Sequence, residues 1–264
     1  MNLLKCALTN TLYGDHECYP LKPNNALRRS LIALGRSCGI RLLTTRTPTA
    51  EDRAEGKVIP PFAHTAVGRA RLDHLQHCLE TVVRDGIAGD VIETGIWRGG
   101  TVIFMRAALN VLGERGRTVW AADSFAGLPK PRPEHSPDAG ARWHTRRELA
   151  VDRRTVEATM ERYGLREGVS FLEGWFADTL PHAPIERLAI IRLDGDMYGS
   201  TIDALQALYP KLQPGGFLVI DDYYGVNACA SAVDDYRAAH QIEEPIERVD
   251  WTCAYWRRRL APES

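Results

Sequence analysis

The pattern of apolar and polar positions divides the chain into two parts. Up to about residue 62, prolines and glycines interrupt the apolar positions, and only residues 31–43 have helical spacing. Residues 44–61 are polar and contain several prolines, which is typical of a loop or a mobile lid. We therefore predict an N-terminal extension or lid over residues 1–62 and one folded domain over residues 63–264.

In the second part, short apolar runs alternate with stretches of helical spacing. This order predicts parallel strands joined by helices that cover both faces of one sheet, a doubly wound α/β fold whose ligand lies at the carboxyl ends of the strands. The last two runs predict a hairpin that adds an antiparallel edge. The expected strands are residues 90–95, 118–122, 169–172, 188–193 and 217–220, the hairpin is 246–249 with 254–256, and the helices are 72–83, 102–109, 155–163, 201–212 and 227–240.

Composition and charge narrow the possible partners. Hydrophobic residues make up 44% of the 264 residues, and the formal net charge is −1, so no field favours nucleic acid or an anionic membrane. The six cysteines have no C-x-x-C spacing, which argues against a zinc site or a disulfide framework and favours a reducing, cytoplasmic location. No apolar run has membrane-spanning length, and the start lacks a secretory signal. The expected partner is a small molecule, and a homo-oligomer is left open.

The turn after the first strand of the domain carries Glu93-Thr94-Gly95-Ile96-Trp97-Arg98-Gly99-Gly100. Glycines at such a turn let a ligand approach the backbone and the helix N-terminus. A dinucleotide site needs G-x-G-x-x-G, but Trp97 occupies the place of the second glycine, and Glu93 would repel a pyrophosphate. Glu93 instead suits a cationic ligand such as the amino or sulfonium group of S-adenosylmethionine. A tight turn without a ligand is the alternative.

Two further strand ends offer nucleoside contacts. Asp123 ends the second strand, where a carboxylate can accept hydrogen bonds from both ribose hydroxyls. Trp175 and Phe176 follow the third strand and could stack on an adenine ring. Taken alone, Asp123 could equally cap the strand, and the two aromatic residues could belong to the core. The combination with Glu93 and Gly95 favours the cofactor site.

Four carboxylates follow the fourth and fifth strands. Asp194 and Asp196 end one, and Asp221 and Asp222 end the other. Because consecutive strands of this order are neighbours, the four side chains should converge, and such crowding is costly without a cation. Neither segment carries Lys or Arg beyond the strand end. All-oxygen ligands select Mg²⁺ or a similar hard ion, although an aspartate at a strand end can also cap the next helix.

This chemistry suits methyl transfer to an alcohol. A metal ion acidifies and orients a bound hydroxyl, which is otherwise a poor nucleophile. We assign Asp194, Asp221 and Asp222 to the metal and Asp196 to the general base. The roles of Asp194 and Asp196 could be exchanged, since the sequence does not fix which side chain faces the ion.

These residues lie in segments that resemble the macrocin O-methyltransferase (TylF-like) family. The matching segments run in order from about residue 61 to 256 and are Ala63–Thr65, Leu75–Cys78, Glu93–Gly100, Ala122–Pro129, Gly174–Phe176, Leu193–Asp196, Pro214–Phe217 and Asp221–Tyr223. The resemblance implies a class I, Rossmann-like methyltransferase that uses S-adenosylmethionine and Mg²⁺ to methylate a deoxysugar hydroxyl on an antibiotic, with a glycosylated small molecule as acceptor. It implies the same three metal ligands and the same base. The cofactor contacts that it implies are Thr65, Ala66, Glu93, Thr94, Gly95, Ile96, Trp97, Asp123, Ser124, Phe125, Ala126, Gly127, Asp152, Trp175 and Phe176.

Other functions remain to be distinguished. Asp194-Gly195-Asp196 also fits the D-x-D motif of a metal-dependent glycosyltransferase, although Glu93 disfavours its nucleotide diphosphate. A phenol or catechol O-methyltransferase would share the three-carboxylate metal site. A nicotinamide oxidoreductase is disfavoured by the departure from G-x-G-x-x-G, and a non-catalytic module by the cost of clustered carboxylates. The segment 21–60 is the least familiar part and leaves the acceptor open.

Overall fold

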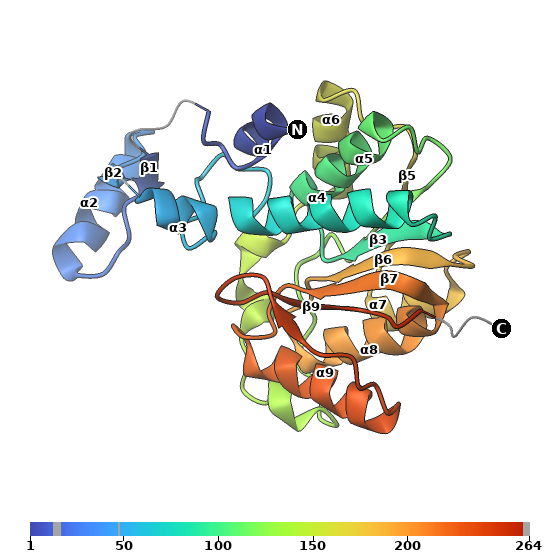
Figure 1. The fold of residues 1–264 in the computed structure, drawn as a ribbon. Helices are drawn as coiled ribbons and strands as arrows, with labels where there is room; N and C mark the ends of the chain where they lie inside the picture. Colours follow the sequence, from blue (N-terminus) through green and yellow to red (C-terminus); the bar gives the residue numbers. More distant parts are fainter. Residues whose placement is uncertain (13–16, 47, 261–264) are drawn as a thin grey trace. The chain divides into compact units, whose positions relative to one another are not determined.

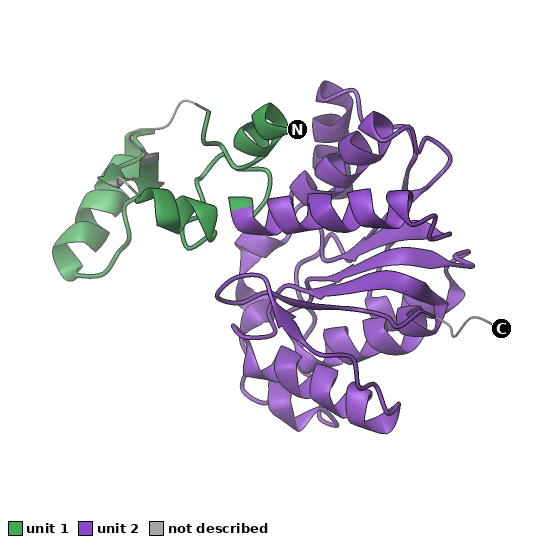
Figure 2. Ribbon diagram, in the orientation of Figure 1, with its two compact units in different colours: residues 1–69 green, residues 70–264 purple. Residues whose placement is uncertain are grey.

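The computed structural model of the protein describes residues 1–12, 17–46 and 48–260, and the chain forms two compact units (Figures 1 and 2). Unit 1 comprises residues 1–69 and unit 2 comprises residues 70–264 (Figure 2). Among the described residues, no helix is both long enough and apolar enough to cross a bilayer. All six cysteines are free thiols.

Unit 1 is more regular than its sequence predicts. It contains α1 (Asn2–Leu8), β1 (Glu17–Pro20), α2 (Ala26–Ser37), β2 (Leu43–Arg46) and α3 (Ala50–Ala54). The strands β1 and β2 pair antiparallel, and α3 begins at a capping box, so the expectation of irregular structure is wrong here.

The helix expected over residues 31–43 also lies earlier in the chain. The side chain of Asn25 accepts from the backbone N–H of Arg28 at 2.8 Å, which starts α2 at Ala26. The helix ends at Ser37, shortly before Gly39, whose φ is 71°. The residues at its two ends therefore set the bounds of α2. The prediction from apolar spacing alone, residues 31–43, placed the helix several residues too late in the chain.

Unit 2 contains a seven-stranded sheet in the order β5-β4-β3-β6-β7-β9-β8. The first five strands in this order are parallel, and β9 and β8 add an antiparallel edge, which confirms the doubly wound fold. Helices cover both faces, with α4, α5 and α6 on one side of the sheet and α7, α8 and α9 on the other (Figure 1). The strands are β3 (Asp90–Thr94), β4 (Val119–Asp123), β5 (Val169–Glu173), β6 (Leu188–Leu193), β7 (Leu212–Ile220), β8 (Glu247–Arg248) and β9 (Ala254–Arg257). The helices are α4 (Arg69–Arg84), α5 (Gly100–Val111), α6 (Arg153–Arg162), α7 (Phe176–Thr179), α8 (Tyr198–Leu208) and α9 (Asn227–Ala239), with 3₁₀ turns at Ser136–Asp138, Trp143–Thr145, Arg147–Leu149, Leu180–His182 and Tyr209–Lys211.

The strand order places the candidate site. From β3 the chain adds β4 and β5 on one side, then returns to add β6 and β7 on the other. The order in which strands are added therefore reverses between β3 and β6. Doubly wound sheets bind their ligands in the crevice at the carboxyl ends of the strands at such a reversal. All six residues of β6 are buried, so this strand lies in the centre of the core.

Candidate active site

Gly95 brings the turn after β3 against the end of β6. Its φ is 84°, and a Cβ atom on Gly95 would lie 1.7 Å from the carbonyl oxygen of Asp194, so a side chain has no room. The backbone N–H of Asp194 donates to the carbonyl oxygen of Thr94 at 2.9 Å. The turn predicted to bind the cofactor and the strand end predicted to bind the metal are therefore in contact.

Glu93 lies near the end of β3 and is 1% exposed. Its carboxylate accepts hydrogen bonds from the hydroxyl of Thr101, at 2.5 Å to Oε2, and from the guanidinium of Arg192. Burial raises the pKa of Glu93, and the positive charge of Arg192 opposes this shift. Glu93 is therefore a buried carboxylate next to the glycine turn, and Arg192 is its cationic partner.

Asp123 connects the turns that follow β3 and β4. Its Oδ2 accepts from the backbone N–H groups of Ile96 at 2.8 Å and Trp97 at 3.3 Å, while its Oδ1 accepts from Phe125 at 2.7 Å. Trp97 and Phe125 both have positive φ, 47° and 55°, a conformation that costs energy for large side chains and is concentrated at functional sites. Asp123 therefore holds two strained turns in place at the carboxyl end of β4.

The carboxylates predicted to bind metal converge as expected. One oxygen each from Asp194, Asp221 and Asp222 lies within 4.8 Å of the others. Asp196 follows with a φ of 55°, and burial together with the charge of Asp221 raises the pKa of Asp196 to about 6. Burial and the neighbouring carboxylates also raise the pKa values of Asp194 and Asp222. Without a further cation, negative charge on this group is therefore costly.

Two arginines from outside the loops that follow β6 and β7 partly compensate these carboxylates. Arg192, within β6, contacts Asp221 and lies 3.0 Å from Asp194 Oδ2. Arg71, in α4, contacts the other oxygen of Asp221 and donates to Asp250 at 2.6 Å. Burial alone would raise the pKa of Asp221, but the two guanidiniums hold it below its usual value.

The two arginines still leave an excess of negative charge. They form ion pairs with four carboxylates, namely Glu93, Asp194, Asp221 and Asp250, and the charges of Asp196 and Asp222 add to this group. In the part of the chain that the structure describes, the buried Oδ2 of Asp222 has no hydrogen-bond partner. A buried carboxylate oxygen without a donor indicates a missing positive group, and hard oxygen ligands fit Mg²⁺ or a similar ion. The residues present therefore fit a divalent cation.

Comparison with known proteins assigns the chain to a family. The macrocin-O-methyltransferase (TylF) family matches residues 1–258. The chain belongs to this family.

Individual relatives agree with this assignment. One is the 8-demethyl-8-(2,3-dimethoxy-alpha-L-rhamnosyl)-tetracenomycin-C 4'-O-methyltransferase of Streptomyces olivaceus, 52% identical over 81% of this chain and 83% of the relative. Another is the mycinamicin III 3''-O-methyltransferase of Micromonospora griseorubida, 48% identical over 82% and 87%. The solved structure of the O-methyltransferase NovP superposes with a TM-score of 0.84 at 38% identity and covers 98% of this chain and 97% of NovP. The protein is thus an O-methyltransferase with the class I fold, and S-adenosylmethionine is its methyl donor.

In this TylF-family methyltransferase, the other cofactor residues expected in unit 2 have varied surroundings. Ser124 and Ala126 close the turn after β4, since the Ser124 hydroxyl donates to the carbonyl of Gly127 at 2.6 Å and accepts from the backbone N–H of Ala126 at 3.0 Å. Trp175 is 39% exposed and precedes α7, while Phe176 lies beside Gly195. These positions suit a ligand at the carboxyl ends of β4 and β5.

Asp152 has a structural partner of its own. It is exposed and caps α6, where its side chain accepts from the backbone N–H of Thr155 at 3.0 Å and from the Thr155 hydroxyl at 2.5 Å. Its predicted cofactor contact stays a prediction.

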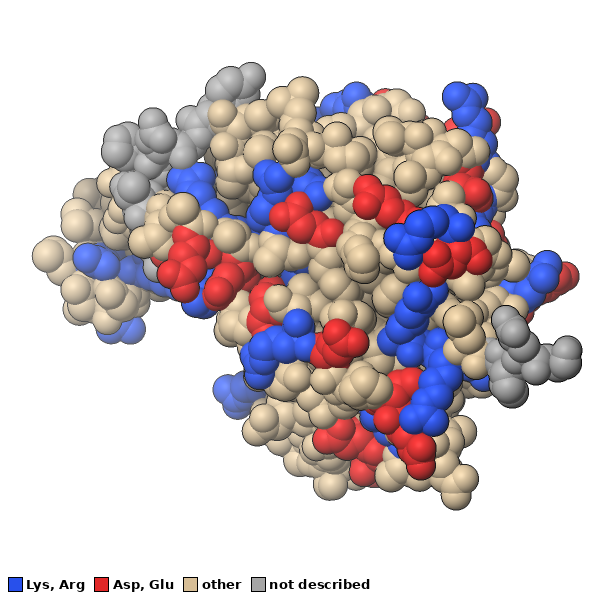
Figure 3. Space-filling view, in the orientation of Figure 1, with Lys and Arg blue, Asp and Glu red and all other residues tan. Residues whose placement is uncertain are grey.

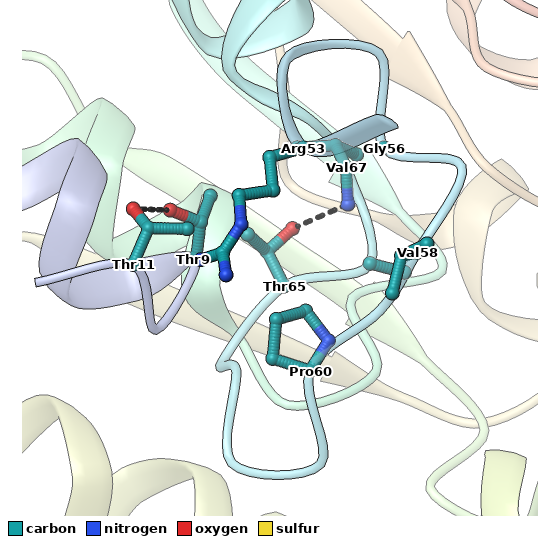
Figure 4. Close-up of a pocket in the computed structure, with 9 residues that line it drawn as sticks. Thr9, Thr11, Arg53, Gly56, Val58, Pro60, Thr65 and Val67 are labelled. Carbon is teal, nitrogen blue, oxygen red and sulfur yellow. Dashed lines mark hydrogen bonds between the residues drawn. The ribbon is translucent and has the colours of Figure 1, made fainter. Parts of the chain in front are cut away.

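Thr65 and Ala66 belong to unit 1 of the methyltransferase. They line a cavity of about 10 Å³, which is close to the smallest volume that holds one water molecule. Figure 4 shows Thr65 pointing its hydroxyl to the backbone N–H of Val67, a hydrogen bond of 3.2 Å. The cavity is also lined by Thr9, Thr11, Arg53, Gly56, Val58 and Pro60.

Arg192 is the main residue that the sequence-based interpretation missed. A charged residue within an otherwise apolar strand, Leu188–Leu193, was the available signal, because burying an arginine requires carboxylate partners. Arg71 and Asp250 gave no such signal, because they are distant in sequence and meet only in the fold.

On the face that Figure 3 shows, basic and acidic residues are interspersed.

Proposed function

We propose that the protein transfers the methyl group of S-adenosylmethionine to a sugar hydroxyl of a glycosylated secondary metabolite, with the help of Mg²⁺. The printed names of the relatives support the acceptor class, since one names a rhamnosyl-tetracenomycin substrate and another names mycinamicin III. The observation that carries the metal requirement is the buried Oδ2 of Asp222, which has no hydrogen-bond partner among the described residues and lies beside two further carboxylates.

The residues divide into a cofactor side and an acceptor side. Glu93 and Asp123 would hold the amino acid and ribose parts of S-adenosylmethionine, which supplies the methyl group. Asp194, Asp221 and Asp222 would hold the ion, which orients and acidifies the acceptor hydroxyl when bound. Asp196, whose pKa is raised to about 6, would accept the hydroxyl proton.

Exposed aromatic side chains near the acidic group supply a surface for the acceptor. Tyr224 is 38% exposed and lies two residues after Asp222, with the guanidinium of Arg248 over its ring, and Trp251, 46% exposed, follows Asp250. The two loops are joined by a hydrogen bond of 2.8 Å from the backbone N–H of Tyr224 to the carbonyl of Thr252. Aromatic rings bind the apolar faces of sugars and aglycones, so we assign this pair to acceptor binding.

The test is methyl transfer from deuterium-labelled S-adenosylmethionine to glycosylated metabolites, followed by mass spectrometry. We expect labelled product on the sugar in Mg²⁺ and none in EDTA, with activity restored when Mg²⁺ is returned. The matched aglycone and a catechol serve as control acceptors. Full turnover in EDTA would refute the metal role, and label on the catechol or aglycone in preference to the sugar would refute the acceptor class.

A further inference from the structure

Arg192 connects two groups of residues with different proposed roles. Its Nη1 contacts Glu93 on the cofactor side and lies 3.0 Å from Asp194 Oδ2 on the metal side. Its Nη2 contacts Oδ1 of Asp221. The Arg192 side chain is 2% exposed, so water does not screen these contacts. One guanidinium is therefore shared by three carboxylates that serve two binding sites.

The sheet dictates this sharing. Arg192 is paired in register with Glu93 on β3, and Asp221 follows the residue of β7 that pairs with Leu193. A planar guanidinium with several fixed donors reaches all three carboxylates, whereas the compact ammonium of lysine would not. The place of residue 192 in β6 and the planar shape of the guanidinium together explain why this residue is an arginine.

Asp221 has little freedom to adjust by itself. Arg71 contacts its Oδ2 and also binds Asp250 and Thr252, which fixes Arg71 in turn. A change at Glu93 should therefore affect ion binding by Asp194 and Asp221 mainly through the charge and position of Arg192. When a cationic ligand binds Glu93, or Glu93 loses its charge, the guanidinium of Arg192 interacts more strongly with Asp194 and Asp221. These two carboxylates then bind a cation more weakly.

We propose that Arg192 is a positioning residue that couples the cofactor site to the metal site, so that a change at Glu93 alters binding of the ion and a change at Asp194 or Asp221 alters binding of the cofactor. The inference rests on the function proposed above. Coupling of this kind is reciprocal and is measured as a change in a dissociation constant.

The experiment is a double-mutant cycle on Glu93 and Arg192, read as the Kd of Mg²⁺ by calorimetry on cofactor-free protein. Glu93→Gln should weaken Mg²⁺ binding by about fivefold or more in the presence of Arg192. In the Arg192→Lys background, Glu93→Gln should change the Kd by less than about twofold, since the bridge is already broken. Mn²⁺ provides a second ion for the same measurement.

Arg106→Lys is the matched control. Arg106 is as buried as Arg192, at 1% exposure, but it binds the carbonyl oxygens of Arg117 and Glu114 instead of the site carboxylates. We expect this variant to lose thermal stability while its Kd for Mg²⁺ stays unchanged. A role of Arg192 in stability alone would give the same result for Arg192→Lys.

A second measurement keeps Arg192 in place, in case Arg192→Lys does not fold. Asp194→Asn should weaken binding of S-adenosylhomocysteine to ion-free protein by about fivefold, because Arg192 then neutralises Glu93 more fully. An unchanged Kd would contradict the coupling. The coupling would also be contradicted if Glu93→Gln left the Kd of Mg²⁺ unchanged, or changed it equally in the presence of Arg192 and in the Arg192→Lys background. If the wild-type protein does not bind Mg²⁺ at all, the proposed metal role fails, and this inference fails with it.

Discussion

At the scale of single residues, the three proposed metal ligands are not equivalent. Both oxygens of Asp221 are engaged by guanidiniums, so its position is fixed before any ion binds. Asp194 keeps 27% side-chain exposure, and Asp222 has a buried oxygen that finds no hydrogen-bond partner in residues 1–12, 17–46 and 48–260. We therefore expect Asp222 to gain most from an ion and Asp221 to act mainly as a rigid support.

Asp222→Asn tests this difference. The amide removes the negative charge of the carboxylate and places a donor where the ion should bind, so kcat/KM should fall by about 10²–10³-fold. Binding of S-adenosylhomocysteine should stay within about twofold, since the hydrogen-bond partners of Glu93 and Asp123 among the described residues do not include Asp222. Asp235→Asn is the control, because Asp235 is an exposed residue of α9 that accepts a hydrogen bond from the Tyr198 hydroxyl. Equal losses in the two variants would show that the effect is not specific to the site.

Asp123→Asn addresses the cofactor side. The variant retains one acceptor oxygen, although wild-type Asp123 uses both to hold three backbone N–H groups. We expect a loss of about 1–3 kcal/mol in the free energy of unfolding and at least tenfold weaker binding of S-adenosylhomocysteine. The Kd of Mg²⁺ should not change. Calorimetry measures both constants, and unaltered cofactor affinity would remove Asp123 from the cofactor site.

The convergence of these residues could be predicted because each ends a strand. Parallel strands of one sheet bring their carboxyl ends to one edge, so Glu93, Asp123 and the four later aspartates had to meet. Which of them would already be paired could not be predicted. The pairing of Arg71 with Asp221 joins residues 150 positions apart and depends on where α4 packs.

At the scale of secondary-structure elements, Gly95 controls how closely β3 approaches the end of β6. Any side chain there would overlap the carbonyl of Asp194, and its φ of 84° is unfavourable for other residues. The contact therefore links two parts of the sheet that are far apart in sequence.

Gly95→Ala should disturb both sites together. Because the clash is with backbone, the free energy of unfolding should fall by more than about 3 kcal/mol, and binding of Mg²⁺ and S-adenosylhomocysteine should weaken. Gly113→Ala is a matched control: Gly113 has a φ of 82°, but a Cβ atom there would meet nothing within 4 Å. The control should lose only about 1–2 kcal/mol from backbone strain. Chemical denaturation compares the two, and equal losses would remove the role of the Asp194 contact.

The elements of unit 2 were predicted better than those of unit 1. Strands such as β6 and β3 are buried along their length and stand out as apolar runs. β1 and β2 are short, and their residues are mostly exposed, so no alternation marks them. The capping box of Thr49 and Asp52, which starts α3, was a usable local signal within a segment expected to be a loop.

At the scale of the whole molecule, His74 makes stability depend on pH. It lies in α4 against the ring of Tyr255, 4.1 Å between centroids, and 3.6 Å from the Cys78 sulfur. Burial lowers the pKa of His74 to about 4. The unfolded chain would take up a proton near pH 6.5, whereas the folded protein takes it up only near pH 4.

Stability should therefore fall as the pH is lowered from about 6.5 to 4, because the unfolded state binds more protons in that window. The contribution of His74 is at most roughly 3 kcal/mol, reduced by the partial exposure of the ring. His74→Gln should flatten this part of the stability profile relative to wild type, whereas His182→Gln, at an exposed position, should not. Urea denaturation at several pH values tests this, and parallel profiles for wild type and His74→Gln would contradict it.

The strand order also has a consequence for recombination between relatives. The cofactor residues proposed in unit 2 all precede β6, and the proposed ion ligands all follow its start, so one crossover in the loop before Leu188 separates them. A chimaera joined there would inherit its nucleoside preference from one parent and its acceptor preference from the other. It would succeed only if both parents preserve the fit of Gly95 against Asp194, of Glu93 against Arg192 and of Arg71 against Asp221, which makes these pairs a compatibility test for exchanging halves within the family.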